Sequence, residues 1–208
     1  MLWVWEGFNG AVLLGLMLSC WIILSTSDAL VQRIKQRGIL QIGRGFWGMF
    51  VSHMGVAATV LGIVISSGFG VQKDVRIAPG EQVMLAGYRI EFVSESSLTG
   101  PNYHGARACF KIHSGTRAHV IFPEKRVYDI GHMAMTDSAI DVNLFRDLYI
   151  ALGEPLGREA WSVRLYYKPF VRWIWGGGVL MVLGGLLALS NKRYRVKKIV
   201  LNGSSVVL

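Results

Sequence analysis

The sequence predicts a membrane protein with three transmembrane α-helices and one mainly-β periplasmic domain inserted between helices two and three. The first observation is composition, because 52% of the residues are hydrophobic and only 17% are charged. The mean hydropathy of +0.40 is too high for an ordinary soluble domain. Second, the apolar residues gather in three runs, each close to the ~20 residues that a helix needs to cross a bilayer. Third, the segment between the second and third runs has the composition of a globular domain.

The apolar runs cover about residues 10–26, 46–68 and 170–190. They divide the chain into a first transmembrane helix with a short outer N-terminus (1–27), a basic cytoplasmic loop (28–45), a second transmembrane helix (46–69), the mainly-β domain (70–168), a third transmembrane helix (169–190) and a basic cytoplasmic tail (191–208).

The distribution of charge predicts the topology. The chain carries a net charge of +9, and most of the excess lies in the loop 28–45 and the tail 191–208. Their basic residues are Arg33, Lys35, Arg37, Arg44, Lys192, Arg193, Arg195, Lys197 and Lys198. Cytoplasmic loops are enriched in Lys and Arg, so we expect both segments in the cytoplasm and residues 70–168 outside. In a bacterial inner membrane, the outer side is the periplasm. Nucleic-acid binding is not needed to explain the charge.

The N-terminus does not resemble a signal peptide. Residues 1–10 contain no Lys or Arg and include Glu6, whereas a signal peptide begins with a positive region. An outer N-terminus without an export signal suggests a piece of a larger polytopic protein, or one subunit of a split protein.

His53 is the strongest candidate for a functional residue. It is the only ionisable side chain in the apolar run 46–68. An ionisable group at bilayer depth costs several kcal/mol unless it is partnered, so it is functional by default. Neutral imidazole is a common axial ligand of haem iron. A hydrogen bond to a neighbouring helix, or proton or quinone chemistry, would also explain the residue.

The spacing of small residues predicts how the second helix packs. Gly48, Gly55 and Gly62 recur every seventh residue, and His53 points about 140° away from them. One face can therefore pack tightly on a neighbouring helix while another presents the imidazole. The residues predicted around the imidazole are Phe46, Met49, Ala57, Val60 and Val64. This surface suits a flat apolar cofactor, and it suits an interhelical hydrogen bond equally well.

The start of the third helix carries aromatic and basic residues. Tyr166, Tyr167, Trp173 and Trp175 have the spacing of an interfacial aromatic belt, with Lys168 and Arg172 at headgroup level. Lipid anchoring is one interpretation. The other is that cations here, namely Arg164, Lys168 and Arg172, contact haem propionates or the acidic surface of a partner.

Residues 70–168 read mostly as strands separated by turns. The strand-like runs are 82–85, 88–93, 108–112, 119–122 and 161–167, and the turns are Ala-Pro-Gly at 78–80, Leu-Thr-Gly-Pro-Asn at 98–102 and His-Ser-Gly at 113–115. One helix is expected around 143–152, with Gly153 as its C-terminal cap. The domain is therefore expected to be a small antiparallel sandwich or barrel seated on two helices.

We predict no catalytic residues in this domain. Its histidines lack the spacing of a zinc site and are expected to lie on the surface or to hydrogen-bond; they are His104, His113, His119 and His132. Asp137 and Asp141 have no paired base or nucleophile, so residues 136–141 read as a loop. The domain has the character of a binding platform.

Five runs of the sequence carry a family resemblance. They are Ser-His-Met-Gly-Val-Ala-Ala-Thr-Val-Leu-Gly-Ile at 52–63, Gly-Pro-Asn-Tyr at 100–103, Pro-Glu-Lys-Arg-Val-Tyr at 123–128, Arg-Asp-Leu-Tyr-Ile-Ala-Leu-Gly-Glu at 146–154 and Leu-Tyr-Tyr-Lys-Pro-Phe-Val-Arg-Trp-Ile-Trp-Gly-Gly-Gly at 165–178. The last run is the most specific. Together the runs resemble the C-terminal third of the CcmF family, the membrane subunit of the bacterial cytochrome c haem lyase, and the resemblance covers residues 46–194.

The resemblance implies a role in haem attachment. The family takes haem from a CcmE-type chaperone and, with a CcmH-type lyase subunit, attaches it to Cys-x-x-Cys-His of apocytochrome c. The resemblance also implies a haem b held between two transmembrane histidines, of which His53 would be the second axial ligand of the iron. This chain has no second intramembrane histidine and lacks the family's tryptophan-rich segment. The other ligand would come from missing sequence or from another chain, such as the N-terminal part of CcmF, so we expect no lyase activity from this chain alone.

The alternative belongs to another class of function. The chain would be a non-catalytic membrane scaffold whose periplasmic domain binds a protein partner, and His53 would only pack between helices.

Overall fold

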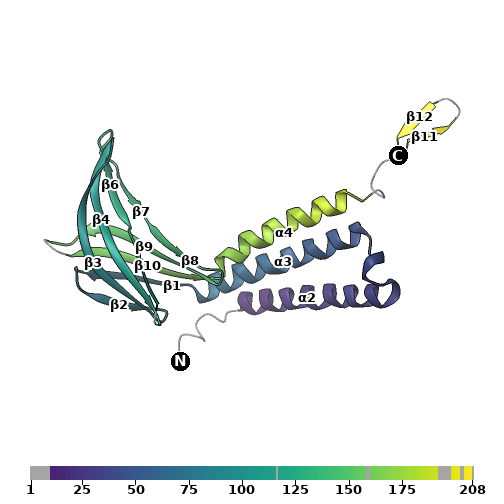
Figure 1. The fold of residues 1–208 in the computed structure, drawn as a ribbon, viewed down its shortest axis with the longest axis horizontal. Helices are drawn as coiled ribbons and strands as arrows, with labels where there is room; N and C mark the ends of the chain where they lie inside the picture. Colours follow the sequence, from purple (N-terminus) through teal and green to yellow (C-terminus); the bar gives the residue numbers. More distant parts are fainter. Residues whose placement is uncertain (1–9, 116, 158–159, 192–197, 202–203, 208) are drawn as a thin grey trace. The chain divides into compact units, whose positions relative to one another are not determined.

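The computed structural model describes residues 10–115, 117–157, 160–191, 198–201 and 204–207. The chain forms two compact units (Figure 1). One contains Phe8–Val64 and Trp173–Leu208, which include most of the three long helices. The other contains Ile65–Arg172, which include the ten strands of the inserted domain.

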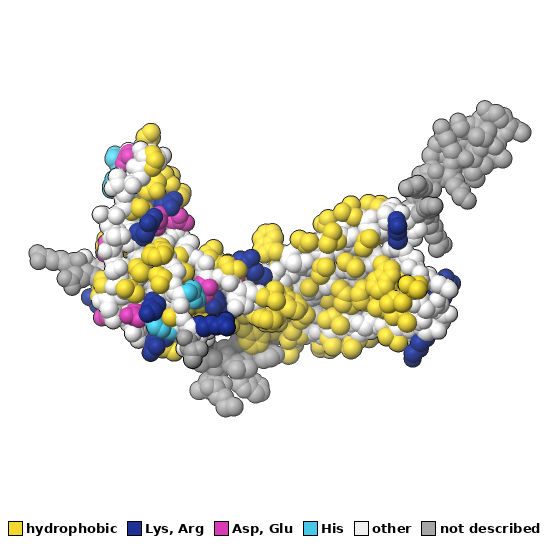
Figure 2. Space-filling model, in the orientation of Figure 1, with side chains coloured by type: hydrophobic (Ala, Val, Ile, Leu, Met, Phe, Trp, Pro, Cys, Tyr) yellow, Lys and Arg dark blue, Asp and Glu magenta, His cyan; other side chains and the backbone are white. Residues whose placement is uncertain are grey.

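The three predicted transmembrane helices are present as α2 (Gly10–Arg37), α3 (Arg44–Phe69) and α4 (Val171–Leu189). Each is long and apolar enough to cross a membrane. Apolar side chains cover much of their visible surface (Figure 2). Exposed large apolar side chains on all three helices, such as Leu14 of α2, Ile63 of α3 and Trp175 of α4, fit a lipid environment rather than water.

Helix α2 is longer than the predicted apolar run. It continues through Arg33 and Lys35 to Arg37, so the first part of the segment predicted as a basic loop is helical. Residues 27–37 contain no glycine or proline, and the helix ends where Gly38 adopts a left-handed φ of 72°. Only residues 38–43, with the short 3₁₀ helix η1 (Ile39–Gln41), connect α2 to α3.

Parts of two predicted segments lie outside the described residues. These are residues 1–9 of the short outer N-terminus and residues 192–197 of the basic tail. Within the segment predicted as a tail, β11 (Lys198–Leu201) and β12 (Ser204–Val207) form an antiparallel hairpin.

The inserted domain is a β-sandwich, as predicted. One antiparallel sheet has the strand order β1-β10-β9-β8, and the other has the order β2-β3-β4-β6-β7, with β5 also paired to β4. The strands are β1 (Val71–Ile77), β2 (Gln82–Leu85), β3 (Tyr88–Thr99), β4 (Tyr103–Ser114), β5 (Arg117–Ile121), β6 (Glu124–Tyr128), β7 (Ala134–Asp137), β8 (Ala139–Val142), β9 (Arg146–Pro155) and β10 (Trp161–Pro169).

The core of the sandwich comes from alternate residues of its long strands, because successive side chains of a strand point to opposite faces. Phe92 of β3 and Phe110 of β4 stack with ring centroids 4.7 Å apart, and both are fully buried. Leu148, Ile150 and Leu152 of β9 face them from the other sheet, since all belong to one buried cluster. This alternation fixes which face of each strand remains outside.

The helix predicted around residues 143–152 is wrong, because this segment forms β9. The buried residues Leu148, Ile150 and Leu152 alternate with more exposed ones, which is the period of a strand and not of a helix. Gly153 is not a helix cap. A Cβ there would lie 3.0 Å from the carbonyl oxygen of Ser162 on β10, so this glycine permits close strand packing.

Residues 136–141 also differ from the prediction of a loop. They lie in β7 and β8, and both aspartates have arginine partners. Asp137 lies 2.8 Å from Arg126, and Asp141 pairs with the buried Arg146. Arg126 is distant in sequence from Asp137, and Arg146 lies in the segment that the sequence predicts as a helix. Neither ion pair is therefore evident from the sequence.

Candidate functional site

The orientation of α3 is set by its contact with α4, and the predicted glycine face makes that contact. A Cβ on Gly48 would lie 2.6 Å from the carbonyl oxygen of Gly184, and one on Gly55 would lie 2.7 Å from that of Gly177. No side chain fits at either point. Small residues let the two backbones approach, as is common between transmembrane helices.

Two hydroxyl groups join α3 to α4 along the same face. Ser52 Oγ donates to the carbonyl oxygen of Met181, and Thr59 Oγ1 donates to that of Ile174, each over 3.4 Å. In a membrane such bonds contribute about 0.6 kcal/mol each. Together with the glycines, they oppose rotation of α3 about its axis and so direct His53, which follows Ser52 in the chain.

Helix α2 covers another part of α3. A Cβ on Gly15 would overlap the side chain of Val64, and the guanidinium of Arg33 lies 5.1 Å from the centroid of the Phe46 ring. Ala57 is fully buried. Three residues predicted around the imidazole, Phe46, Ala57 and Val64, therefore have contacts or burial within the helical unit. The predicted apolar surface around His53 is correspondingly narrower.

His53 itself lies on the exposed side of α3. Met49 and Ile63 are exposed on the same side of the helix, within about 80° of the histidine. Two faces of α3 thus contact neighbouring helices, and the face that carries the imidazole remains accessible. The prediction that His53 points away from the glycine face is consistent with these contacts.

One hydrogen bond determines the protonation pattern of the imidazole. His53 Nδ1 lies 2.8 Å from the main-chain carbonyl oxygen of Met49, one helical turn earlier. A carbonyl oxygen can only accept, so Nδ1 must donate and carries the proton of the neutral ring. The lone pair of the neutral ring is then on Nε2. This is the arrangement in which metal-ligating histidines are oriented by a bond from their other ring nitrogen.

The remaining histidines do not form a second ligand at membrane depth. His104, His113 and His119 lie on β4 and β5, and His132 lies in the turn after β6. Among the residues that the structure describes, no three His, Cys, Asp or Glu side chains gather around a common point. His53 can supply one axial ligand to a haem, and the residues present fit half of a bis-histidine site.

Three of the domain histidines have carboxylate partners that the sequence did not indicate. His104 Nδ1 lies 3.2 Å from Asp129, and His113 Nε2 lies 3.1 Å from Glu91. His119 Nε2 lies 3.1 Å from Asp141, but outside hydrogen-bonding geometry. Each pair joins different strands or a strand and a turn. These pairs fit the prediction that the domain histidines lie on the surface or form hydrogen bonds better than they fit a metal site.

The three candidate cations lie near one end of the sheet β1-β10-β9-β8 or on its outer face. Arg164 Nε donates to Asp74 over 2.7 Å, and Arg172 Nε donates to the buried Asp147 over 3.3 Å. Lys168 has no carboxylate partner among the described residues; its Nζ lies 5.6 Å from the ring centroids of Tyr149 and Tyr166.

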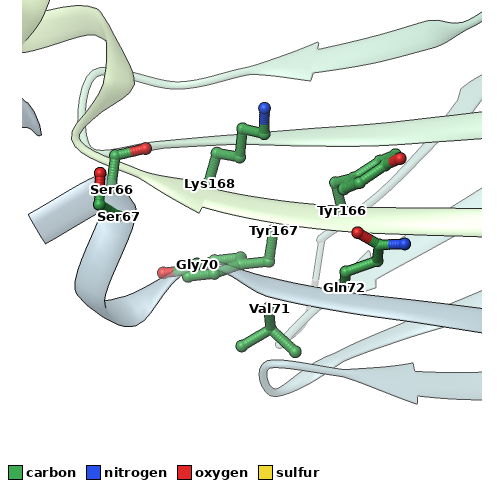
Figure 3. Close-up of a pocket in the computed structure, with 8 residues that line it drawn as sticks. All are labelled: Ser66, Ser67, Gly70, Val71, Gln72, Tyr166, Tyr167 and Lys168. Carbon is green, nitrogen blue, oxygen red and sulfur yellow. The ribbon is translucent and has the colours of Figure 1, made fainter. Parts of the chain in front are cut away.

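Lys168 borders a shallow hollow of about 270 Å³ where α3 joins β1. In Figure 3 the side chains of Lys168, Tyr166 and Gln72 rise from the same side of strands β1 and β10. Ser66 and Ser67 contribute hydroxyl groups from the last turn of α3. The hollow is polar and open, and it offers one positive charge.

A buried ion cluster in the domain also escaped sequence reasoning. Glu124 is almost completely buried and accepts hydrogen bonds from Arg107 and Arg126, at 2.7 and 2.6 Å. Burial alone would raise the pKa of Glu124. The bonds from Arg126 and Arg107 outweigh burial and hold the pKa below its usual value. Arg107 and Glu124 are directly paired across β4 and β6, a register that only the folded sheet reveals.

Taken together, the fold is that of a multi-pass membrane protein with a β-sandwich inserted between its second and third helices, and with one accessible histidine on a membrane helix. The family model described as the CcmF C-terminal beta-sandwich matches residues 68–169. The chain belongs to the CcmF family, and the part of the family that it matches is the C-terminal one.

Relatives of known role agree with this assignment. The cytochrome c-type biogenesis protein CcmF of Pseudomonas fluorescens is 43% identical over 195 residues, covering 91% of this chain and 30% of the relative. The protein of the same name from Escherichia coli K12 is 43% identical over 202 residues, with shares of 93% and 30%. The cytochrome c-type biogenesis protein NrfE of Haemophilus influenzae is 33% identical over 192 residues, with shares of 92% and 29%.

A solved structure described as the cytochrome c heme lyase CcmF has the same fold. It superimposes with a TM-score of 0.64 and 23% identity, over 86% of this chain and 34% of that one. This chain therefore spans about 30% of the length of the relatives it matches, and it is the C-terminal region of a CcmF-type cytochrome c biogenesis protein.

Proposed function

We propose that the chain serves cytochrome c maturation as part of a CcmF-type haem lyase, in which His53 is an axial ligand of a membrane haem b. The remaining ligand would come from the N-terminal part of CcmF. In this proposal the chain contributes half of a haem site and a periplasmic binding domain, and covalent haem attachment requires the complete assembly.

The observation that carries the proposal is the bond between His53 Nδ1 and the carbonyl oxygen of Met49. It leaves Nε2 of the neutral imidazole with its lone pair on an accessible helix face. A histidine that only packed between helices would be expected to face α2 or α4. The packing interpretation is therefore less well supported than ligation.

The neighbours of His53 support a positioning role for α4. Gly55 and the hydroxyl groups of Ser52 and Thr59 fix the opposite face of α3. A ligand held in one orientation loses little conformational entropy when it binds iron. A bound haem b would supply one-electron redox chemistry. This chain's contribution is to hold one Nε2 at a defined height and direction in the bilayer.

The basic residues around α2 and α3 support a cytoplasmic location for their connection. Arg33, Lys35 and Arg37 lie in the last turns of α2, and Arg44 begins α3. With the positive-inside rule, this distribution supports our proposal that the β-sandwich lies in the periplasm of a bacterial inner membrane. There it would meet a CcmE-type haem chaperone, a CcmH-type lyase subunit and apocytochrome c.

Among the candidate cations, we assign Arg164 to a partner contact in preference to a haem propionate. It is exposed on the outer face of the sheet, at the rim of a hollow of about 280 Å³ that includes Ser138, Gly153 and Ser162. An acidic partner could replace the exposed Asp74 as the acceptor of its hydrogen bonds. Lys168 and Arg172 adjoin the start of α4, where lipid headgroups are the nearer acceptors.

The test is to coexpress this chain with the N-terminal part of CcmF and purify the complex. We expect the absorption spectrum of a low-spin b-type haem. His53→Ala should abolish this spectrum or convert it to a high-spin one, and imidazole added to the variant should restore part of the low-spin signal. The spectrum reports ligation independently of cytochrome c maturation.

His104→Ala is the matched control, because His104 is exposed on the β-sandwich and its loss should leave the haem spectrum unchanged. An unchanged haem spectrum in His53→Ala would show that His53 is not a ligand of the haem iron. If cytochrome c also matured normally without the chain while another envelope complex failed to assemble, the scaffold function would replace the lyase function.

A further inference from the structure

The β-sandwich is joined to its two membrane spans without linkers. Gly70 alone separates α3 from β1, and Phe170 alone separates β10 from α4. Strands β1 and β10 pair at this point, with Val71 opposite Tyr167. Because α3 and α4 are membrane spans, the end of the domain that carries both connections begins at the level of the membrane surface.

The turn between β8 and β9, residues 143–145, is attached to this same end. The main-chain N–H of Phe170 donates to the carbonyl oxygen of Phe145 over 2.9 Å. The rings of Phe145 and Phe170 also contact each other edge to face, with centroids 5.7 Å apart. Phe170 is the residue before the first residue of α4, so the turn lies at the height where the span begins.

Two large apolar side chains of the turn remain uncovered. Leu144 is 63% exposed and Phe145 is 53% exposed. Exposed leucine and phenylalanine at adjacent positions of a tight turn are unfavourable in water but favourable at a bilayer surface. Their position beside the start of a membrane span makes lipid the nearest apolar phase.

The main chain of the turn is suited to that phase because three of its polar groups are already paired within the protein. The N–H of Asn143 donates to the carbonyl oxygen of Arg146 over 2.8 Å, and the N–H of Phe145 donates to Asn143 Oδ1 over 3.3 Å. The carbonyl oxygen of Phe145 accepts the bond from Phe170. Backbone groups paired within the protein do not oppose transfer out of water.

The turn is also held rigidly from the inside of the domain. The buried Arg146 forms an ion pair with Asp141 and donates to its carbonyl oxygen, and its guanidinium lies 4.6 Å from the centroid of the Tyr88 ring. These contacts tie β8, β9 and β3 together at the base of the turn. Leu144 and Phe145 are therefore presented in one conformation.

The charged side chains nearby match phospholipid headgroups. Arg172 and Lys168 are exposed, whereas Asp147, which lies opposite Lys168 on β9, is buried and paired with Arg172. The surface beside the turn is thus positive. Apolar tips next to cations are the arrangement expected of a segment seated among lipid phosphates and the first methylene groups.

We propose that the β8–β9 turn is a membrane anchor of the sandwich, with Leu144 and Phe145 inserted into the lipid surface and Lys168 at the level of the phosphates. The anchor would hold the domain against the bilayer at a third point, beside its two covalent connections. It is independent of the haem proposed at His53.

The proposal can be tested with the full chain in nanodiscs of phosphatidylethanolamine and phosphatidylglycerol. In a Cys20→Ser, Cys109→Ser background, an environment-sensitive fluorophore is attached to Leu144→Cys. Lipids carrying a spin label near the headgroup should quench it strongly, and its emission should shift to the blue. Lys168→Gln should weaken the quenching in anionic nanodiscs more than in neutral ones.

Ile130→Cys is the matched control, since Ile130 is an equally apolar and 90% exposed residue of the β6–β7 turn. That turn adjoins the β3–β4 turn and neither connection to the spans. We expect quenching at least threefold weaker there. Equal quenching at both sites, or none at Leu144→Cys, would overturn the anchor. A blue shift without lipid quenching would mean that protein covers the turn, and would also overturn it.

Discussion

Gly55 of α3 and Gly177 of α4 approach so closely that a Cβ on Gly55 would lie 2.7 Å from the carbonyl oxygen of Gly177. This contact, repeated at Gly48, sets the distance and rotation of the helix that carries His53. The hydrogen bond from His53 to Met49 then selects the nitrogen that can bind a metal. Backbone packing between two spans thereby positions the candidate ligand.

The first prediction concerns this contact. Gly55→Val should force α3 and α4 apart, because the added side chain meets backbone atoms that cannot move independently. Overpacking of this kind costs about 1–3 kcal/mol. Thermal unfolding in detergent, followed by tryptophan fluorescence, should show a lower midpoint. Gly176→Val is the control, because no atom lies within 4 Å of the corresponding position on α4. Equal effects of the two variants would contradict the assigned packing.

The second prediction concerns the hydroxyl groups. Removing both in Ser52→Ala with Thr59→Ala should destabilise the helical unit by about 1 kcal/mol, since interhelical bonds of this type average about 0.6 kcal/mol each. The same variant should broaden the electron paramagnetic resonance signal of a haem ligated by His53, because the imidazole plane would be less well fixed. Ser67→Ala, on the exposed side of α3, should change neither quantity. A sharp electron paramagnetic resonance signal in the double variant would show that these hydroxyl groups do not position the imidazole.

The third prediction compares two arginine–aspartate pairs of the sandwich. Arg146 is 7% exposed and pairs with Asp141. Arg146→Gln leaves a poorly solvated carboxylate without its cation, which costs about 3–5 kcal/mol for a buried pair. Arg164→Gln removes an exposed pair with Asp74, which solvent screens, so the free energy of unfolding should change little. Chemical denaturation followed by far-ultraviolet circular dichroism should separate the two variants, and comparable losses would contradict the difference in burial.

The fourth prediction concerns acid sensitivity. The pKa of Glu124 is lowered in the folded protein, so the ionised carboxylate stabilises the fold above its unfolded pKa of about 4.5. That stabilisation should be lost as the pH falls from about 4.5 through the lower folded pKa. Glu124→Gln should flatten the loss of thermal stability in this acid range while lowering stability at neutral pH. If the thermal stability of Glu124→Gln falls with decreasing pH as steeply as that of the parent protein, other carboxylates cause the loss.

Local patterns predicted most of the architecture. The three spans and the strands around residues 82–85, 88–93, 108–112 and 161–167 are all present, because apolar length and alternation are properties of neighbouring residues. The segment 143–152 was misread as a helix. Gly153 resembles the C-terminal cap of a helix, but Leu148, Ile150 and Leu152 alternate as in a strand, and pairing with β10 decides in favour of the strand.

The candidate site was predictable in part. That His53 is the sole ionisable group of its span, and that the chain holds no second intramembrane histidine, follow from the sequence. Its accessible face does not follow, because Phe46, Ala57 and Val64 all point in a similar direction but contact other groups or are buried. Only the packing of α2 and α4 divides the surface of α3 into covered and open parts.

By itself, the sequence determined the number of spans, the insertion of a β domain between two of them, the asymmetry of basic residues and the resemblance to the CcmF family. The tertiary structure decided which face of α3 is open, which nitrogen of His53 is protonated and which arginine neutralises each buried carboxylate. Hydrophobic length and charge bias act along a continuous segment. Rotation, tautomer and ion pairing depend on contacts between residues that only folding brings together.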